Sequence, residues 1–147
     1  LEPSLLSKIN IIKGAESVSG KQQLKNAFDV LKNATFENKF LFIWDCDAKE
    51  TVDSLVESDN IKVFSFEPNL DNTKLSKGKH SGIEDLYRDE LFTEDMYEEI
   101  SVLGEFGAIG AIRHLKKKEF CFKIRNLTDQ SEFRKFQPLI EKIKNVI

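Results

Sequence analysis

The sequence predicts a single α/β domain with about four mainly parallel strands flanked by helices. Apolar runs of strand length alternate four times with segments of helical periodicity. The connections between these runs are long crossovers, which parallel strands require, and not tight hairpins. Hydrophobic residues make up 40% of the chain and charged residues 32%, which suits a buried core with a charged surface. No internal repeat or linker divides residues 1–147, so we expect one domain.

The four predicted strands are short apolar runs. Residues 40–44 (FLFIW) form an uninterrupted run of the kind that is buried on both faces of a parallel sheet. The other three predicted strands cover 9–13 (INIIK), 61–66 (IKVFSF) and 120–124 (FCFKI).

Helical spacing or polar helical composition marks the segments between and after these strands. The predicted helices cover residues 21–32, 49–57, 83–92, 94–103 and 131–147, and Pro138 is expected to bend or interrupt the last of them. Eight phenylalanines fall on positions that predict core packing and not base stacking: Phe40, Phe42, Phe64, Phe66, Phe120, Phe122, Phe133 and Phe136.

Composition limits the compartment and the partners. No apolar run approaches the length that crosses a bilayer, and no signal peptide opens the chain, so we expect a soluble protein without a membrane partner. Cys46 and Cys121 are too few for a disulfide framework or a zinc site, which favours the reducing cytoplasm. The net charge of −3 does not indicate a broadly basic nucleic-acid-binding protein.

An acidic pair, Asp45 and Asp47, directly follows the run 40–44. One residue separates the two aspartates, so in an extended chain both side chains project the same way. Ligands of open parallel sheets bind beyond the carboxyl ends of the strands, and two carboxylates there suit a hard cation such as Mg2+ or Mn2+. The alternative is that one aspartate caps the following helix. We favour the metal, because a single aspartate would suffice for a cap.

An Asp-x-Asp motif after a buried strand resembles the motifs of three families. In haloacid-dehalogenase-like phosphatases the first aspartate is the nucleophile, but here the following Ala48 and Lys49 replace the usual glycine and threonine. The motif is also similar to the metal-binding pair of nucleotide-sugar glycosyltransferases. The third family is the TOPRIM domain of topoisomerases, primases and overcoming-lysogenization-defect (OLD) nucleases.

Three further segments favour the third family. Residues 11–24 (IIKGAESVSGKQQL) resemble the strand, glycine loop and helix that precede Asp-x-Asp in TOPRIM domains fused to OLD-type ATPases. Residues 81–86 (SGIEDL) resemble a Lys-Gly-Ile-Glu-Asn-Leu-like motif that follows a strand and a polar loop in those proteins. Residues 131–139 (SEFRKFQPL) are similar to their C-terminal end. The resemblance spans nearly the whole chain.

The resemblance implies a Rossmann-like, TOPRIM-like fold and a Mg2+-dependent nuclease that hydrolyses DNA phosphodiester bonds, with a role in phage defence. Asp45 and Asp47 would hold the metal ion, and Glu84 would be a third ligand or catalytic residue. The alternative for Glu84 is an acid that interacts favourably with the dipole of a helix that starts there. We expect the neighbouring Asp85 to be a surface residue.

One position departs from the family pattern. A TOPRIM domain opens with a strand ending in Glu-Gly, whose glutamate is a general acid or base, whereas Lys13 precedes Gly14 here. Glu16 is a less suitable substitute, because it lies in the loop beyond the predicted strand. The chain also begins without methionine, so we expect a fragment whose catalytic strand and N-terminal ATPase region lie upstream. The alternative is a catalytically degenerate regulatory or dimerisation module, and a homodimer is compatible with either.

A polar loop over residues 67–82 follows the predicted strand 61–66, and loops of this length are usually functional or mobile. It carries Lys74, Lys77, Lys79 and His80. These residues are the best candidates for contacts to the DNA backbone, because lysine side chains commonly bind phosphate oxygens. The alternative is an ordinary solvated loop.

Overall fold

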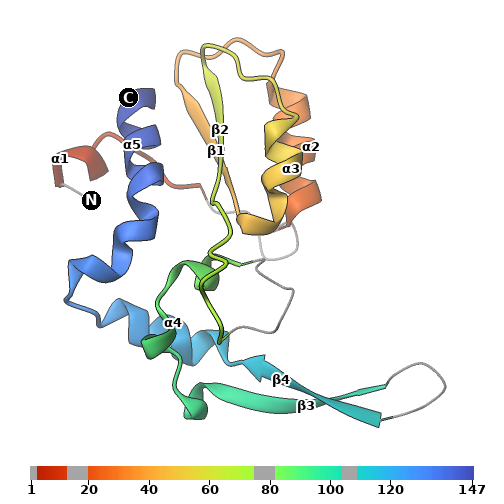
Figure 1. The fold of residues 1–147 in the computed structure, drawn as a ribbon. Helices are drawn as coiled ribbons and strands as arrows, with labels where there is room; N and C mark the ends of the chain where they lie inside the picture. The colour runs from red at the N-terminus through yellow and green to blue at the C-terminus, as the bar shows by residue number, and fades with distance from the viewer. Residues whose placement is uncertain (1–2, 13–19, 75–81, 104–108) are drawn as a thin grey trace. The chain divides into compact units, whose positions relative to one another are not determined.

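The computed structural model describes residues 3–12, 20–74, 82–103 and 109–147 (Figure 1). They form two compact units. The first consists of the described residues of Leu1–Pro68, Ser81–Ile83 and Phe136–Ile147, and the second of those of Asn69–His80 and Glu84–Lys135. Helices and strands are both present, so the α/β class is confirmed. No helix in the described ranges is both long and apolar enough to cross a membrane.

A parallel pair of strands forms the sheet of the first unit. Strand β1 (Phe40–Trp44) runs beside β2 (Ile61–Ser65), with the first residues of the two strands paired and Trp44 beside Ser65. The connection contains a 3-10 helix (Cys46–Ala48) and helix α3 (Lys49–Asp53). The prediction of parallel strands joined by a helical crossover is confirmed for this pair, although α3 is shorter than the predicted helix over 49–57.

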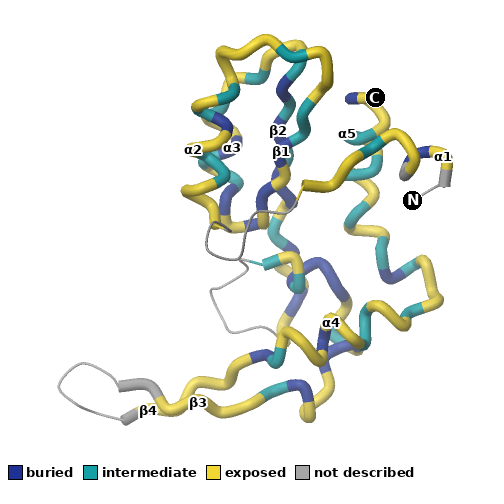
Figure 2. Tube along the Cα trace, turned by 180° about the vertical axis from the view of Figure 1, so that it is seen from behind, coloured by how far each residue is buried: buried dark blue, intermediate teal, exposed yellow. Residues whose placement is uncertain are grey.

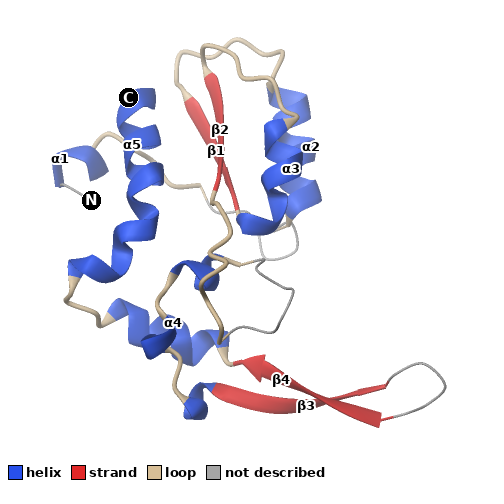
Figure 3. Cartoon of the chain, in the orientation of Figure 1, coloured by secondary structure: helices blue, strands red, loops and turns tan. Residues whose placement is uncertain are grey.

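Helices cover both faces of this sheet (Figure 3). Helix α2 (Lys21–Leu31) contacts β1 and α3 contacts β2 on one face, while α5 (Gln137–Val146) contacts both strands from the other. The short helix α1 (Pro3–Leu6) lies near the N-terminus. The predicted helix over 131–147 is divided into a 3-10 helix (Gln130–Phe136) and α5, so the prediction that it is interrupted near Pro138 is confirmed. Pro138 occupies the first turn of α5, where a proline costs no helical hydrogen bond.

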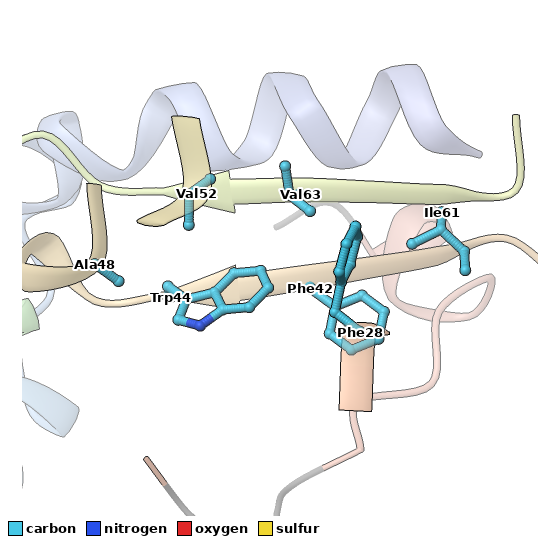
Figure 4. Packing of buried hydrophobic residues seen from close by; sticks show 7 residues of the cluster. All are labelled: Phe28, Phe42, Trp44, Ala48, Val52, Ile61 and Val63. Carbon is cyan, nitrogen blue, oxygen red and sulfur yellow. The ribbon is translucent and has the colours of Figure 1, made fainter. Parts of the chain in front are cut away.

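The core of the first unit lies between the sheet and helices α2 and α3 (Figure 4). Phe28 of α2 is 1% exposed and packs edge-on against Phe42, with ring centroids 5.7 Å apart. Trp44 stacks on Phe42 at 5.8 Å. Ala48, Val52, Ile61 and Val63 complete the cluster. Burying large apolar side chains is the main favourable term in folding, so this cluster holds the helices onto the sheet.

The outer face of β1 is less covered than the sequence predicts. Phe42 and Trp44 are buried, but Ile43 between them is 41% exposed, and Figure 2 shows this alternation of burial along the chain. The prediction that residues 40–44 are buried on both faces is therefore wrong. The sheet has two strands in the described part of the chain, and α5 covers that face only in part.

The predicted strand over residues 9–13 is not present in residues 9–12, which have no regular secondary structure, while Lys13 lies outside the described residues. Ile11 and Ile12 are 68% and 78% exposed. An apolar run forms a strand only where a neighbouring strand accepts its backbone hydrogen bonds, and β2 is the only described strand that pairs with β1.

The second unit contains an antiparallel hairpin. Strands β3 (Tyr97–Leu103) and β4 (Ile109–Leu115) pair along their full length, from Tyr97 beside Leu115 to Leu103 beside Ile109. Helix α4 (Lys117–Arg125) follows and buries Phe120, whose ring stacks on Phe92 with centroids 4.6 Å apart. The prediction of mainly parallel strands is therefore wrong for half of the strands in the described residues.

Two predictions of helix are wrong in this unit. The predicted helix over 94–103 is a short 3-10 helix (Glu94–Met96) followed by β3. Residues 97–103 (YEEISVL) are rich in aromatic and β-branched side chains, which fit a strand once a partner strand is present. The predicted helix over 83–92 consists instead of two short 3-10 helices, Ile83–Leu86 and Asp89–Leu91.

The predicted strand over 120–124 is also wrong, because these residues belong to α4. Periodicity alone cannot tell a short apolar run in a strand from one in a helix. In a helix Phe120 and Ile124 share a face, whereas Phe122 points elsewhere. Phe120 is buried and Phe122 is 73% exposed, so the prediction that Phe122 is a core residue is also wrong.

Glu57, in the loop before β2, joins two elements of the first unit, β2 and α5. Its Oε1 accepts a hydrogen bond from the backbone N–H of Val63 in β2 at 2.9 Å and another from Lys142 Nζ of α5 at 2.6 Å. Lys62 Nζ lies 3.7 Å from the other carboxylate oxygen. Burial acts to raise the pKa of Glu57, but the Lys142 ammonium and the Val63 N–H outweigh it and hold the pKa below its ordinary value.

We expect Phe28→Ala to lower the free energy of unfolding of the first unit by about 3–5 kcal/mol, because it leaves a cavity between Phe42 and Trp44. Trp44 is the only tryptophan of the chain, so its fluorescence during urea unfolding reports on this core. Val30→Ala on the same helix is the control: Val30 is 76% exposed, and its loss should change stability by less than about 0.5 kcal/mol. Equal effects of the two changes would contradict the assigned core.

We expect Glu57→Gln to destabilise the first unit at pH 7 more than at pH 3. A carboxyl group whose pKa is lowered by folding contributes stability above its unfolded pKa, and the contribution disappears as the pH falls through the folded pKa. Urea midpoints followed by Trp44 fluorescence at both pH values measure the difference. Glu37→Gln, at an exposed position before β1, should show no such pH dependence.

Candidate functional site

The acidic pair lies at the carboxyl end of β1. Asp45 keeps an extended backbone, with φ −69° and ψ 172°, and its carbonyl accepts a hydrogen bond from the N–H of Ala48 at 3.1 Å. Trp44, Cys46 and Ala48 are buried at 3%, 2% and 0% exposure, whereas Asp45 and Asp47 are both exposed. The buried side chains fix the chain at every second residue, so both carboxylates face solvent.

Helix capping does not account for this pair. Asp45 stands at the N-cap of the 3-10 helix Cys46–Ala48, and no side-chain cap hydrogen bond forms there. The N-cap of α3 is Ala48, which has no side-chain acceptor. The capping alternative is therefore not supported, and both carboxylates remain candidates for binding a cation.

Two lysines lie beside the pair. Lys21 Nζ, from the first turn of α2, donates to the backbone carbonyl of Asp47 at 2.6 Å, and the Lys21 carbonyl accepts a hydrogen bond from Trp44 Nε1 at 3.3 Å. Lys49 Nζ lies 2.9 Å from Asp53 Oδ1 and 2.9 Å from Glu67 Oε1. Hydrogen bonds to these two carboxylates raise the pKa of Lys49, so it stays charged at neutral pH.

Glu67 is a residue that the sequence analysis missed. It lies two residues beyond the end of β2, whereas Asp45 directly follows β1, and the carboxyl ends of parallel strands meet at the same edge of a sheet. The rule that selected the aspartates could therefore have selected Glu67 too. Its side chain is 74% exposed, and Lys49 neutralises its charge.

A surface depression of about 500 Å3 lies beside the pair, lined by residues of α2 and α3. Lys21 lines it and connects it to Asp47 through their hydrogen bond. Lys25 also lines it, but its Nζ pairs with Asp29 at 2.6 Å. The remaining lining residues are Gln22, Glu50, Thr51 and Ser54.

Within the described ranges, no three His, Cys, Asp or Glu side chains are grouped so that they could hold a metal ion. The Asp45–Asp47 pair therefore offers a cation two protein carboxylates, and a bound Mg2+ would keep most of its waters. Cys46, between the two aspartates, is buried, and its Sγ lies 3.6 Å from the carbonyl oxygen of Gly82.

Glu84 belongs to the second unit, whereas Asp45 and Asp47 belong to the first. Its carboxylate is mostly buried and lies 2.9 Å from Lys117 Nζ of α4. A metal-binding role for Glu84 stays a prediction.

The prediction that Asp85 is a surface residue is wrong. Asp85 is fully buried at 0% exposure, and its Oδ2 accepts the backbone N–H of Asn69 at 2.9 Å. The Asn69 side-chain amide donates to the Asp85 carbonyl at 3.0 Å, and the Asn72 amide to the Tyr87 carbonyl at 3.2 Å. Lys135 Nζ lies 3.2 Å from Asn69 Oδ1. Residues 69–72 belong to no helix or strand, so these side-chain contacts hold their backbone in place instead of regular backbone hydrogen bonds.

Side-chain hydrogen bonds also hold the backbone of Thr73 and Lys74. The backbone N–H and the hydroxyl of Thr73 both donate to the Asp89 carboxylate, and the Tyr97 hydroxyl donates to the Lys74 carbonyl at 2.9 Å. The Lys74 side chain is exposed, so it remains a candidate for phosphate contact. Lys77, Lys79 and His80, predicted for the same role, lie outside the described residues.

Tyr87 lies next to this network in the core of the second unit. Its ring packs edge-on against Phe120 and Phe133, with centroid distances of 5.5 and 6.0 Å. Burial raises the pKa of Tyr87 to about 12, so the phenol stays neutral at physiological pH. Tyr87 therefore acts as a packing residue and not as a general base.

Comparison of the chain with protein-family models, curated proteins and solved structures found no match.

We expect Asp85→Ala to increase hydrogen–deuterium exchange of the segment 69–74, because the buried N–H of Asn69 loses its acceptor. An unsatisfied buried donor costs about 1–3 kcal/mol. Asp85→Asn keeps an acceptor oxygen and should show a smaller increase. Asp71→Ala removes an exposed carboxylate from the same segment and should leave exchange at Asn69 unchanged. Equal exchange in the Asp85→Ala and Asp71→Ala proteins would contradict the role of Asp85.

Proposed function

We propose that this chain is a TOPRIM-like, Mg2+-dependent nuclease domain that hydrolyses DNA phosphodiester bonds at Asp45 and Asp47. One observation supports the proposal most directly. The carboxylates of Asp45 and Asp47 are exposed at the carboxyl end of a parallel strand, and the Asp45 side chain forms no cap hydrogen bond to the helix that follows. The crossover from β1 through α3 to parallel β2 is compatible with a Rossmann-like, TOPRIM-like sheet.

The chemistry follows from what a divalent cation supplies when it is bound to carboxylates. It polarises a phosphoryl oxygen and lowers the pKa of a bound water, which provides a nucleophile near neutral pH. Asp45 and Asp47 would hold the ion. The Lys74 ammonium, with Lys77, Lys79 and His80, would contact the phosphate backbone and orient the strand without reading its sequence.

A second candidate is a catalytically degenerate TOPRIM-like module that serves regulation or dimerisation. One specific observation favours it: Lys13 stands where the family resemblance requires the glutamate of a Glu-Gly pair. A positioned acid or base contributes about 100-fold to 10,000-fold in rate, so replacing it by lysine would leave metal binding and remove most of the cleavage.

Metal binding tests the part that both candidates share. We expect calorimetric titration with Mn2+ to show weak binding, with a dissociation constant on the order of 1 mM, because the ion gains two carboxylates and keeps most of its waters. Asp45→Asn combined with Asp47→Asn should abolish the binding heat, and Asp59→Asn, at an exposed turn before β2, should retain it. Binding that survives the double substitution would refute the proposed site.

Plasmid nicking separates the candidates. We expect no detectable nicking of supercoiled DNA at pH 7, and slow nicking with Mg2+ at pH 9, where hydroxide replaces the missing base. The activity should be lost in the double variant and retained in Asp59→Asn. Metal binding without nicking at pH 9 favours the degenerate module, and turnover of phosphomonoesters or nucleotide sugars without nicking favours a phosphatase or glycosyltransferase.

A further inference from the structure

Lys21 is fixed to the carboxyl end of β1 by its side chain and by its backbone. Its Nζ donates to the backbone carbonyl of Asp47 at 2.6 Å, and its own carbonyl accepts a hydrogen bond from Trp44 Nε1 at 3.3 Å. Trp44 is the last residue of β1, and Asp45 directly follows it. These two contacts place the Lys21 ammonium beside the acidic pair, although 26 positions in the sequence separate Lys21 from Asp47.

The ammonium of Lys21 forms no ion pair with a carboxylate in the part of the chain that the structure describes. The neighbouring lysines differ from it: Lys25 Nζ lies 2.6 Å from a carboxylate oxygen of Asp29, and Lys49 pairs with two carboxylates at 2.9 Å. An ammonium has three N–H donors. The Asp47 carbonyl is neutral and occupies one of them, so Lys21 keeps its charge and two donors for a ligand.

The surface next to this ammonium is hollowed. Lys21 lines the depression of about 500 Å3 that is formed by residues of the neighbouring helices α2 and α3 (Figure 1). Gln22, Thr51 and Ser54 add polar side chains to the lining. Because it is a depression of the surface and not an enclosed cavity, a phosphate that belongs to a long polymer can reach it.

We propose that Lys21 binds the DNA phosphate that is polarised by the cation at Asp45 and Asp47. This inference rests on the proposed nuclease function and adds to it a residue that contacts the substrate beside the metal. Lysine suits this role, because its ammonium is a compact charge on a flexible stem and binds phosphate oxygens without reading the bases. An ammonium and a divalent cation on one phosphate both stabilise the charge that develops during hydrolysis.

The charges at the site set the order of binding. Without a cation, the two carboxylates of Asp45 and Asp47 outweigh the single positive charge of Lys21, so the site repels a phosphate. A bound divalent cation neutralises both carboxylates and leaves the charge of Lys21 in excess, so the site then attracts a phosphate. DNA and the cation should therefore strengthen each other's binding, each by the same factor.

Binding of a short fluorescein-labelled DNA duplex to the full chain tests the contact, by fluorescence anisotropy at pH 7 and constant ionic strength. Mg2+ competes for DNA phosphates and weakens ordinary lysine contacts, so a gain of affinity is specific to a metal-coupled site. We expect Mg2+ to raise the affinity of the wild-type chain at least about 5-fold. Lys21→Gln should lose this gain, and its slope of log K against log salt concentration should be smaller by about one.

Lys39→Gln is the matched control for the loss of one positive charge. Lys39 is exposed and directly precedes β1, at the opposite end of the strand from the acidic pair. This variant should keep the gain of affinity with Mg2+ and the salt slope of the wild-type chain. Equal DNA binding by Lys21→Gln and Lys39→Gln would overturn the role of Lys21.

Lys21→Arg separates a phosphate contact from a structural role. Arginine keeps the positive charge, so this variant should retain the gain with Mg2+ and the salt slope. Urea unfolding followed by Trp44 fluorescence measures the stability of the same variants. If Lys21→Gln lowers stability but leaves the salt slope unchanged, Lys21 only supports the backbone of Asp47, and the proposal is wrong.

The double variant Asp45→Asn with Asp47→Asn distinguishes a failure of this inference from a failure of the nuclease proposal. Mg2+ should no longer raise DNA affinity in this background, and a gain that survives would refute the metal site. The repulsion by the carboxylates is also absent, so adding Lys21→Gln should weaken DNA binding even without Mg2+. No effect of Lys21→Gln there would overturn the phosphate contact, whatever the metal does.

Inorganic phosphate offers the same chemistry from another source. It should not displace the duplex from the wild-type chain when it is added at the concentration of the DNA phosphates, because the duplex presents many phosphates on one molecule. Displacement at that concentration would identify a free phosphate as the ligand and overturn the assignment to DNA.

Discussion

The packing of Phe28 against Phe42 and Trp44 is the interaction on which the first unit depends. A parallel pair of strands has few hydrogen bonds of its own, so it is stable only where apolar side chains cover it. Phe28 from α2 and Val52 from α3 provide that cover on one face. The same cluster fixes Trp44, and with it the direction in which the chain leaves the sheet at Asp45.

This core also explains why the two aspartates are presented to solvent. Cys46 and Ala48 continue the burial that Trp44 begins, so the residues between them must point outward. Exposed carboxylates at a strand end are stabilised by nearby positive charge and backbone donors, and here Lys21 binds the backbone of Asp47 and leaves its carboxylate available. A core packed in this way holds Asp45 and Asp47 at the surface, where both are exposed.

The second unit is organised by polar contacts as much as by its aromatic core. The side chains of Asp85, Asn69 and Asn72 form hydrogen bonds with the backbone of segments that have no regular secondary structure. The buried carboxylate of Glu132 pairs with the exposed Arg88. These groups are costly to bury unless every one finds a partner, so they specify one arrangement of the segment that leads to Lys74. The β3–β4 hairpin differs from this segment, because its residues 98–101 and 110–114 are all exposed in the part of the chain that the structure describes.

Local patterns determined much of the first unit. The predicted bounds of β1, β2 and α2 agree with the structure to within one residue. The predictions came from the apolar runs at 40–44 and 61–66 and from the helical spacing of apolar residues from Lys21, and these apolar side chains pack as the patterns require. The position of Asp45 and Asp47 at the strand end followed from the same patterns. The rule that ligands bind beyond the carboxyl ends of parallel strands could also have selected Glu67.

Tertiary structure decided the rest. The run at 120–124 becomes helix because Phe120 packs on Phe92 and Tyr87, and residues 97–103 become a strand because residues 109–115 pair with them. Asp85 is buried because Asn69 and Asn72, distant in sequence, satisfy it. Short segments carry too little local free energy to choose between helix and strand, or between core and surface. That choice is made by partners far along the chain, whose contacts no local pattern contains.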